Sequence, residues 1–205
     1  MTIAPPPERS SERLIAFLDA AIAIALTLLI LPLMESVSEA TTEEQTVVEY
    51  VDEHGWQLLA FTISFMIISM FWRLHHAILL PDTPTSRART TVQFAWLFTI
   101  TLMPVVTALT GGLETDRPLV ASYVGTLAVS AWLLFAIAVV ERRTRTAAGL
   151  PVDTTNGATP LAMALLFTLT LLLALLVPSY YWLLLMTLSS PLRIGLTRLS
   201  ARSAR

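Results

Sequence analysis

Six apolar segments, each long enough to cross a lipid bilayer, dominate this chain of 205 residues. A bilayer core takes about 20 predominantly apolar residues per helix. Only 14% of the residues are charged, against roughly 25% in soluble domains. The sequence therefore predicts an all-α membrane protein with six transmembrane helices. These spans run roughly over residues 13–34, 56–80, 90–110, 119–140, 159–177 and 179–197.

Short tails flank this membrane domain, which extends over residues 13–197. Residues 1–12 form a Pro-rich N-terminal tail, and residues 198–205 form a basic C-terminal tail. The N-terminal tail lacks the basic region of a cleavable signal, so we expect the first span to be retained. The chain has no cysteine, which excludes disulfides and thiolate-bound metals.

The charged residues predict the orientation. All thirteen basic residues are Arg. The six predicted spans place twelve of them on the side of the membrane where the first span begins, and Arg117 on the opposite side. The positive-inside rule therefore places both termini in the cytoplasm, in a multi-pass protein of the cell inner (plasma) membrane.

The first outer loop is acidic and lacks Arg and Lys. Such a rim could concentrate cations, although a solvated connector is the favoured interpretation. Its acids are Glu35, Glu39, Glu43, Glu44, Glu49, Asp52 and Glu53.

Asp19 is the sole carboxylate between Leu14 and Met34. An acid within a membrane helix usually faces a bundle interior or a water path and has a partner. Arg13 is six residues away and does not share its helix face, so the main partner should come from another helix. The sequence leaves a structural pair and a direct role toward ions both open.

The end of the second span supplies candidate partners. Trp72 and His76 lie at i and i+4, on one helix face, with His75 beside them. Because this span returns toward the side where the first begins, these side chains could bond Asp19 and Arg13 in a buried cluster. Adjacent histidines diverge by 100°, which argues against a metal site. A structural hydrogen-bonding role is favoured over proton sensing.

Together these segments resemble the transmembrane protein 175 family of potassium channels. The resemblance rests on an Arg-x-x-x-Phe-x-Asp pattern from Arg13 to Asp19, the following Ile-Ala-x-Thr-Leu-Leu run, and Trp72-x-x-His75-His76. It implies a homotetramer of six-span subunits in which the first helix of each subunit lines a central pore. The implied partners are the lipid bilayer, K⁺ and other monovalent cations. No nucleic acid, cofactor or metal is expected.

The resemblance also implies roles for individual residues. Ile24 would form the constriction, Leu28 and Leu31 further apolar layers of the gate, and Thr27 the position linked to potassium preference. The motif residues Arg13, Asp19 and Trp72, with His75 or His76, would form a hydrogen-bonded network behind the pore helix. Helical geometry agrees, because Asp19 points about 140° away from the face centred on Ile24.

Two departures from the family pattern stand out. Leu18 replaces the motif serine, which removes a hydroxyl from the expected network, and Pro32 is expected to bend the outer end of the first span. No Thr-Val-Gly-Tyr-Gly filter occurs, so a dewetting constriction with modest K⁺ preference is expected.

The main hypothesis is thus a potassium-preferring cation channel. The alternatives are a proton-coupled transporter or proton channel using Asp19, His75 and His76, and a non-conducting membrane scaffold. An enzyme is not expected, because motifs such as Gly-x-Ser-x-Gly and His-Glu-x-x-His are absent.

Overall fold

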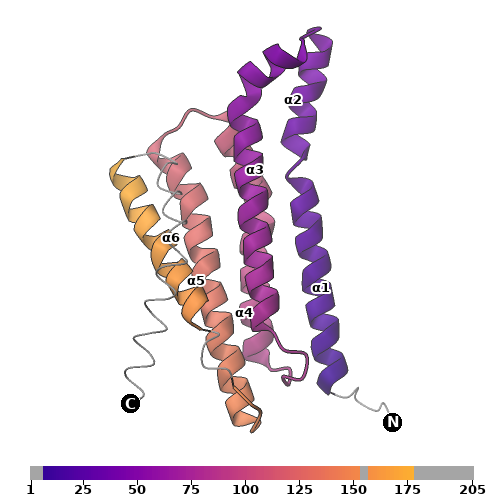
Figure 1. Ribbon diagram of the computed structural model, residues 1–205, viewed down its shortest axis with the longest axis vertical. Coiled ribbons are helices and arrows are strands. Elements are labelled where there is room, and N and C mark those ends of the chain that lie inside the picture. The colour runs from indigo at the N-terminus through magenta and orange to yellow at the C-terminus, as the bar shows by residue number, and fades with distance from the viewer. Residues whose placement is uncertain (1–6, 153–156, 178–205) are drawn as a thin grey trace.

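The computed structural model describes residues 7–152 and 157–177, and these form helices joined by short turns, with no strand (Figure 1). Five helical segments within the described residues are long and apolar enough to cross a membrane. The prediction of an all-α membrane protein is confirmed to this extent, whereas the predicted sixth span, 179–197, lies outside the described residues. The helices are α1 (Pro7–Leu28), α2 (Leu31–Thr42), α3 (Val47–Ile78), α4 (Arg87–Gly112), α5 (Arg117–Ala147) and α6 (Ala158–Leu176).

The first predicted span is divided into two helices. α1 ends at Leu28 and α2 begins at Leu31, so that Leu29 and Ile30 form a turn. Pro32 lies in the first turn of α2 and has no backbone N–H, so the Leu28 carbonyl cannot accept its usual bond from residue 32. The expected bend at Pro32 is therefore present as a helix break.

The acidic segment of residues 35–53 is largely helical. α2 and the first turns of α3 carry most of its acids, and the turn between them is short. Thr46 and Glu49 begin α3 with a capping box, in which each side chain bonds the other's backbone N–H. The Ser36 and Tyr50 hydroxyls bond at 2.9 Å, which joins α2 to α3. The acidic segment is thus formed by α2, a short turn and the start of α3.

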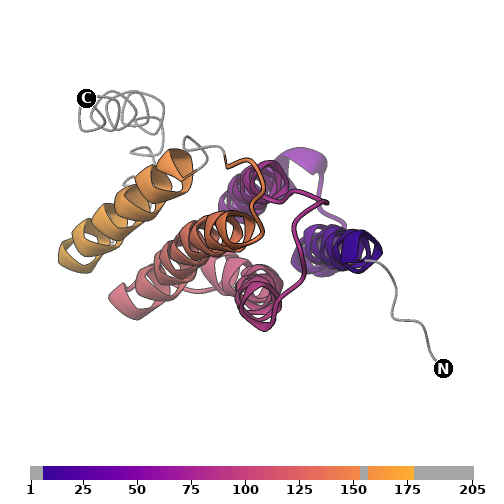
Figure 2. The same cartoon turned by 90° about the horizontal axis from the view of Figure 1, so that it is seen from below.

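Five long helical segments form one elongated bundle (Figures 1 and 2). α4 and α5 pack together in its centre, α1 lies at one side against α3 and α4, and α6 lies at the other side against α5. Fully buried side chains fill the interfaces, among them Trp96, Met103 and Leu134. Because α1 is peripheral, the other described helices cover only one of its faces.

Candidate functional site

One face of α1 is buried and the opposite face is open. Leu18, Ile22, Ala25 and Leu29 are at most 2% exposed and pack into the core. The i, i+3 and i+4 spacing of these residues places them on one side of the helix. The other side of α1 is not covered by the residues that the structure describes.

The open face carries the residues for which the sequence predicts pore roles. Ile24 is 60% exposed and Leu28 is 42% exposed, and Leu31, on α2, is 52% exposed. Thr27 is also exposed, and its hydroxyl donates a 2.8 Å hydrogen bond to the Ile24 carbonyl. We call Ile24, Thr27, Leu28 and Leu31 the open stripe. Its apolar side chains meet no covering partner among the described residues, although the break after Leu28 places Leu31 on a separate helix.

Asp19 lies away from this stripe and faces α3. Trp72 donates a 2.9 Å hydrogen bond from Nε1 to Asp19 Oδ1, and His76 Nδ1 lies 3.9 Å from Oδ2. The rings of Trp72 and His76 are 5.9 Å apart, as the i, i+4 spacing predicts. We call these three residues the Asp19 cluster. It joins the middle of α1 to the last turns of α3.

Arg13 and His75, which the sequence also places near Asp19, do not join this cluster. Arg13 is exposed, and no hydrogen bond or ion pair links it to Asp19 in the part of the chain that the structure describes. His75 is fully buried on another side of α3, where its ring stacks on Trp96 at 4.2 Å. The 100° turn between consecutive helical residues explains why His75 and His76 face different neighbours.

Leu18 occupies an apolar environment in place of the motif serine. Its side chain is 0% exposed and belongs to the same core as Ile22 and Phe71. A serine hydroxyl there would be largely surrounded by hydrocarbon, where an unmade hydrogen bond is costly. Leu18 therefore contributes apolar packing against the neighbouring helices.

A second buried polar group lies between α3 and α4. Both ring nitrogens of His75, both amide atoms of Gln93 and the indole nitrogen of Trp96 have no hydrogen-bond partner among the described residues. Gln93 and Trp96 are one turn apart on α4, and both are fully buried. Leaving a buried polar group without a partner costs about 1–3 kcal/mol, which makes Gln93 a position where an apolar side chain can be tested.

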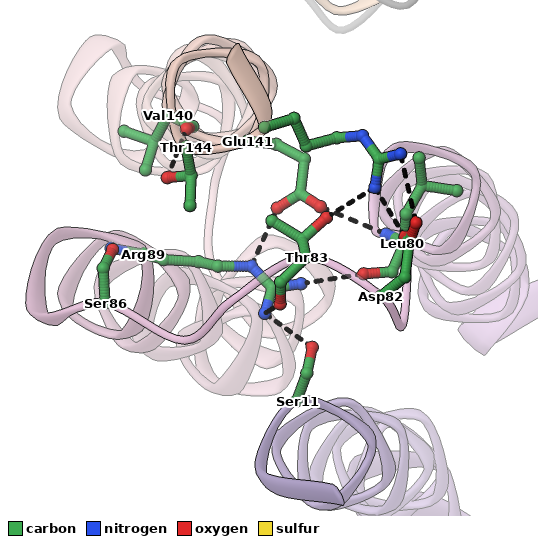
Figure 3. Close-up of polar contacts among 10 residues, drawn as sticks. Ser11, Leu80, Asp82, Thr83, Ser86, Arg89, Val140, Glu141 and Thr144 are labelled. Atoms are coloured by element: carbon green, nitrogen blue, oxygen red, sulfur yellow. Dashed lines mark hydrogen bonds and ion pairs between the residues drawn. The ribbon is translucent and has the colours of Figure 1, made fainter. Parts of the chain in front are cut away.

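The most extensive polar network lies at the end of the bundle where α1 begins (Figure 3). Arg89, in the first turn of α4, is 1% exposed and donates from Nε to Glu141 Oε2 of α5 at 2.8 Å. The same guanidinium donates to Ser11 Oγ of α1 at 2.6 Å and to the carbonyls of Leu80 and Thr83. A single buried arginine therefore joins α1, α5 and the loop between α3 and α4.

Arg145 fixes the same loop from the other side. It forms a two-pronged ion pair with Asp82 and also donates to the Thr83 hydroxyl and the Pro151 carbonyl. The hydrogen bonds from Arg145 lower the pKa of Asp82 below its ordinary value. We call Arg89, Glu141, Arg145 and Asp82 the arginine clamp.

Sequence reasoning missed the arginine clamp. In the sequence, Arg89 and Arg145 count only as two of the thirteen basic residues that predict the orientation. A signal was present in Glu141, the sole carboxylate of α5, which lies four residues before Arg145 at the end of a long apolar run. Its partner Arg89 is 52 residues away, so helical periodicity could not identify the pair.

The described residues contain no group of three or more His, Cys, Asp or Glu side chains that could hold a metal ion. Residues 13–104 match the family described as endosomal/lysosomal potassium channel TMEM175. This match covers the open stripe, the Asp19 cluster and Arg89, and it confirms the resemblance seen in the sequence. No curated protein and no solved structure matches the chain.

Proposed function

Because residues 13–104 match the model of the TMEM175 potassium channel family, we propose that the chain is one subunit of a potassium-preferring cation channel. Four copies would surround a central pore, with α1 of each copy lining it. The observation that carries this proposal is the open stripe, an exposed face on a helix whose opposite face is buried. One subunit has one such helix and cannot enclose a pore alone.

Ile24 and Leu28 would narrow this pore. They are one turn apart, which corresponds to about 6 Å along the helix axis. A ring of such side chains can exclude water when narrow, and ions then cannot cross; widening the ring restores hydration and conduction. The helix break after Leu28 would let the Leu31 layer move separately from the first two.

Thr27 would supply the polar contact in this apolar pore. Its hydroxyl hydrogen is used in the bond to the Ile24 carbonyl, so the oxygen lone pairs remain available to a cation. Four such oxygens replace little of an ion's hydration shell. We therefore expect a modest preference for K⁺ over Na⁺.

Proton transport through Asp19, His75 and His76 is the less favoured function. A relay needs neighbouring groups that exchange protons, and only His76 approaches Asp19. His75 instead stacks on Trp96 on another side of α3. The Asp19 cluster is better suited to bracing α1 against α3.

Purified protein in liposomes tests the proposal. A K⁺ gradient should drive flux, and Ile24→Asn should raise the basal leak because polar side chains keep the constriction hydrated. Leu172→Asn is the matched control, since Leu172 is similarly exposed, at 56%, on α6. Flux that follows only a proton gradient would favour the proton transporter, and a tetramer without any flux would favour the scaffold.

A further inference from the structure

We propose that Arg89, acting through Ser11, is a positioning residue that sets the tilt of the pore-lining helix α1. The inference rests on the proposed function, because it assigns a role in conduction to residues remote from the open stripe. Ser11 lies in the first turns of α1, is fully buried, and accepts a 2.6 Å hydrogen bond from the Arg89 guanidinium (Figure 3). The bond is charge-assisted, so it is stronger than a bond between neutral groups.

Arg89 can act as a fixed anchor because its own position is held independently of α1. Its Nε is bonded to Glu141, and its remaining nitrogens also donate to two loop carbonyls. Glu141 in turn accepts a bond from the Leu80 backbone N–H, and Arg145 holds the same loop through Asp82. Loss of Ser11 therefore leaves the anchor in place and releases only α1.

Two sets of polar contacts then define the direction of α1. The first is the hydrogen bond from Arg89 to Ser11. The second is the Asp19 cluster, which lies eight residues, or about 12 Å, further along the helix. Ile24 lies another five residues, or about 7.5 Å, beyond Asp19. If α1 pivots at Asp19, each 1 Å of movement at Ser11 shifts Ile24 by about 0.6 Å in the opposite direction.

This lever arm makes the pore sensitive to a contact far from it. In a constriction that excludes ions by dewetting, the ion conductance depends steeply on the pore radius. The buried face of α1 around Leu18 and Ile22 is apolar, so its packing holds the helix against the core without a directional hydrogen bond. The Ser11–Arg89 bond supplies the directional restraint that this packing lacks.

Spin labels test the restraint directly, and the absence of cysteine from the chain makes labelling specific. Labels at Glu12→Cys and Ala147→Cys, two exposed positions, report the distance between the start of α1 and the end of α5. Labelled subunits are diluted with unlabelled protein so that only distances within one subunit are measured. We expect Ser11→Ala to widen the distance distribution at least twofold and Ser11→Thr, which keeps a hydroxyl, to restore it.

Thr144→Ala is the matched control. The Thr144 hydroxyl lies in the same region but bonds only the Val140 carbonyl of its own helix, so its loss should leave the distribution unchanged. Arg89→Lys keeps the charge but loses the planar fork, and should widen the distribution as Ser11→Ala does. Should this variant not fold, Ser11→Ala still decides the question.

Flux measurements complete the test. In liposomes, Ser11→Ala should change the basal K⁺ flux at least threefold, whereas Thr144→Ala should not. An unchanged distance distribution in Ser11→Ala overturns the proposal, and so does a widened distribution with unchanged flux. A wild-type protein that passes no K⁺ refutes the proposed channel instead, while the distances still show whether Ser11 restrains α1.

Discussion

The Asp19 cluster allows a quantitative prediction, because its two partners approach the carboxylate differently. Trp72 donates a hydrogen bond of 2.9 Å, whereas His76 lies 3.9 Å away and is 61% exposed. A hydrogen bond to a charged group contributes about 1.5–3 kcal/mol. The Asp19 side chain is 32% exposed, so solvent screening reduces this to about 1–2 kcal/mol. An ion pair as exposed as that with His76 contributes about 0.2–1 kcal/mol, and only when the imidazole is protonated.

Double-mutant cycles measure the two couplings separately. Asp19→Ala is combined with Trp72→Phe in one cycle and with His76→Gln in the other. The free energy of unfolding is followed in detergent micelles by circular dichroism. We expect a coupling of about 1–2 kcal/mol with Trp72 and a smaller value with His76.

Trp132→Phe provides the control for this cycle. The Trp132 indole donates a comparable 2.9 Å hydrogen bond, but to Thr168 on α6, so it should not couple to Asp19. A Trp72 coupling below about 0.5 kcal/mol, the usual error of additivity, would refute the reasoning. A coupling to His76 larger than that to Trp72 would refute it equally.

Three further predictions concern the arginine clamp and the polar group between α3 and α4. Glu141→Gln should lower the free energy of unfolding by about 3–5 kcal/mol, because it leaves the buried Arg89 without a counter-charge. A decrease no larger than that caused by a surface substitution would contradict this prediction. The lowered pKa of Asp82 means that its pairing with Arg145 stabilises the fold above the ordinary pKa of 3.8, and that this contribution is lost as the pH falls through the lowered value. Thermal unfolding from neutral pH to about pH 3 should therefore be less pH-dependent in Asp82→Asn than in the wild type, and equal slopes would count against the pair. Gln93→Leu should be neutral or stabilise the protein by up to about 2 kcal/mol, because it removes two buried polar atoms without partners; a clear loss of stability in the same assay would show that the amide is bonded.

The features that the sequence determined by itself are those that depend on one helix at a time. The length of each apolar segment predicts a membrane span, and five such spans are present in the described residues. The missing N–H of Pro32 predicts a bend in the first span, where the structure has a helix break, and helical angles place Ile24 about 140° from Asp19. The spacing of Trp72 and His76 likewise predicts that they share the face that approaches Asp19.

Only the tertiary structure decided which side chains meet between helices. Arg89 and Arg145 have the same sequence signature as the exposed Arg142 and Arg143, yet both are buried in ion pairs. His75 differs from His76 by one position and lies against Trp96 instead of Asp19. The physical reason is that such pairings depend on the rotation, tilt and depth of each helix against its neighbours, which packing of the whole bundle fixes and which no local period of the chain records.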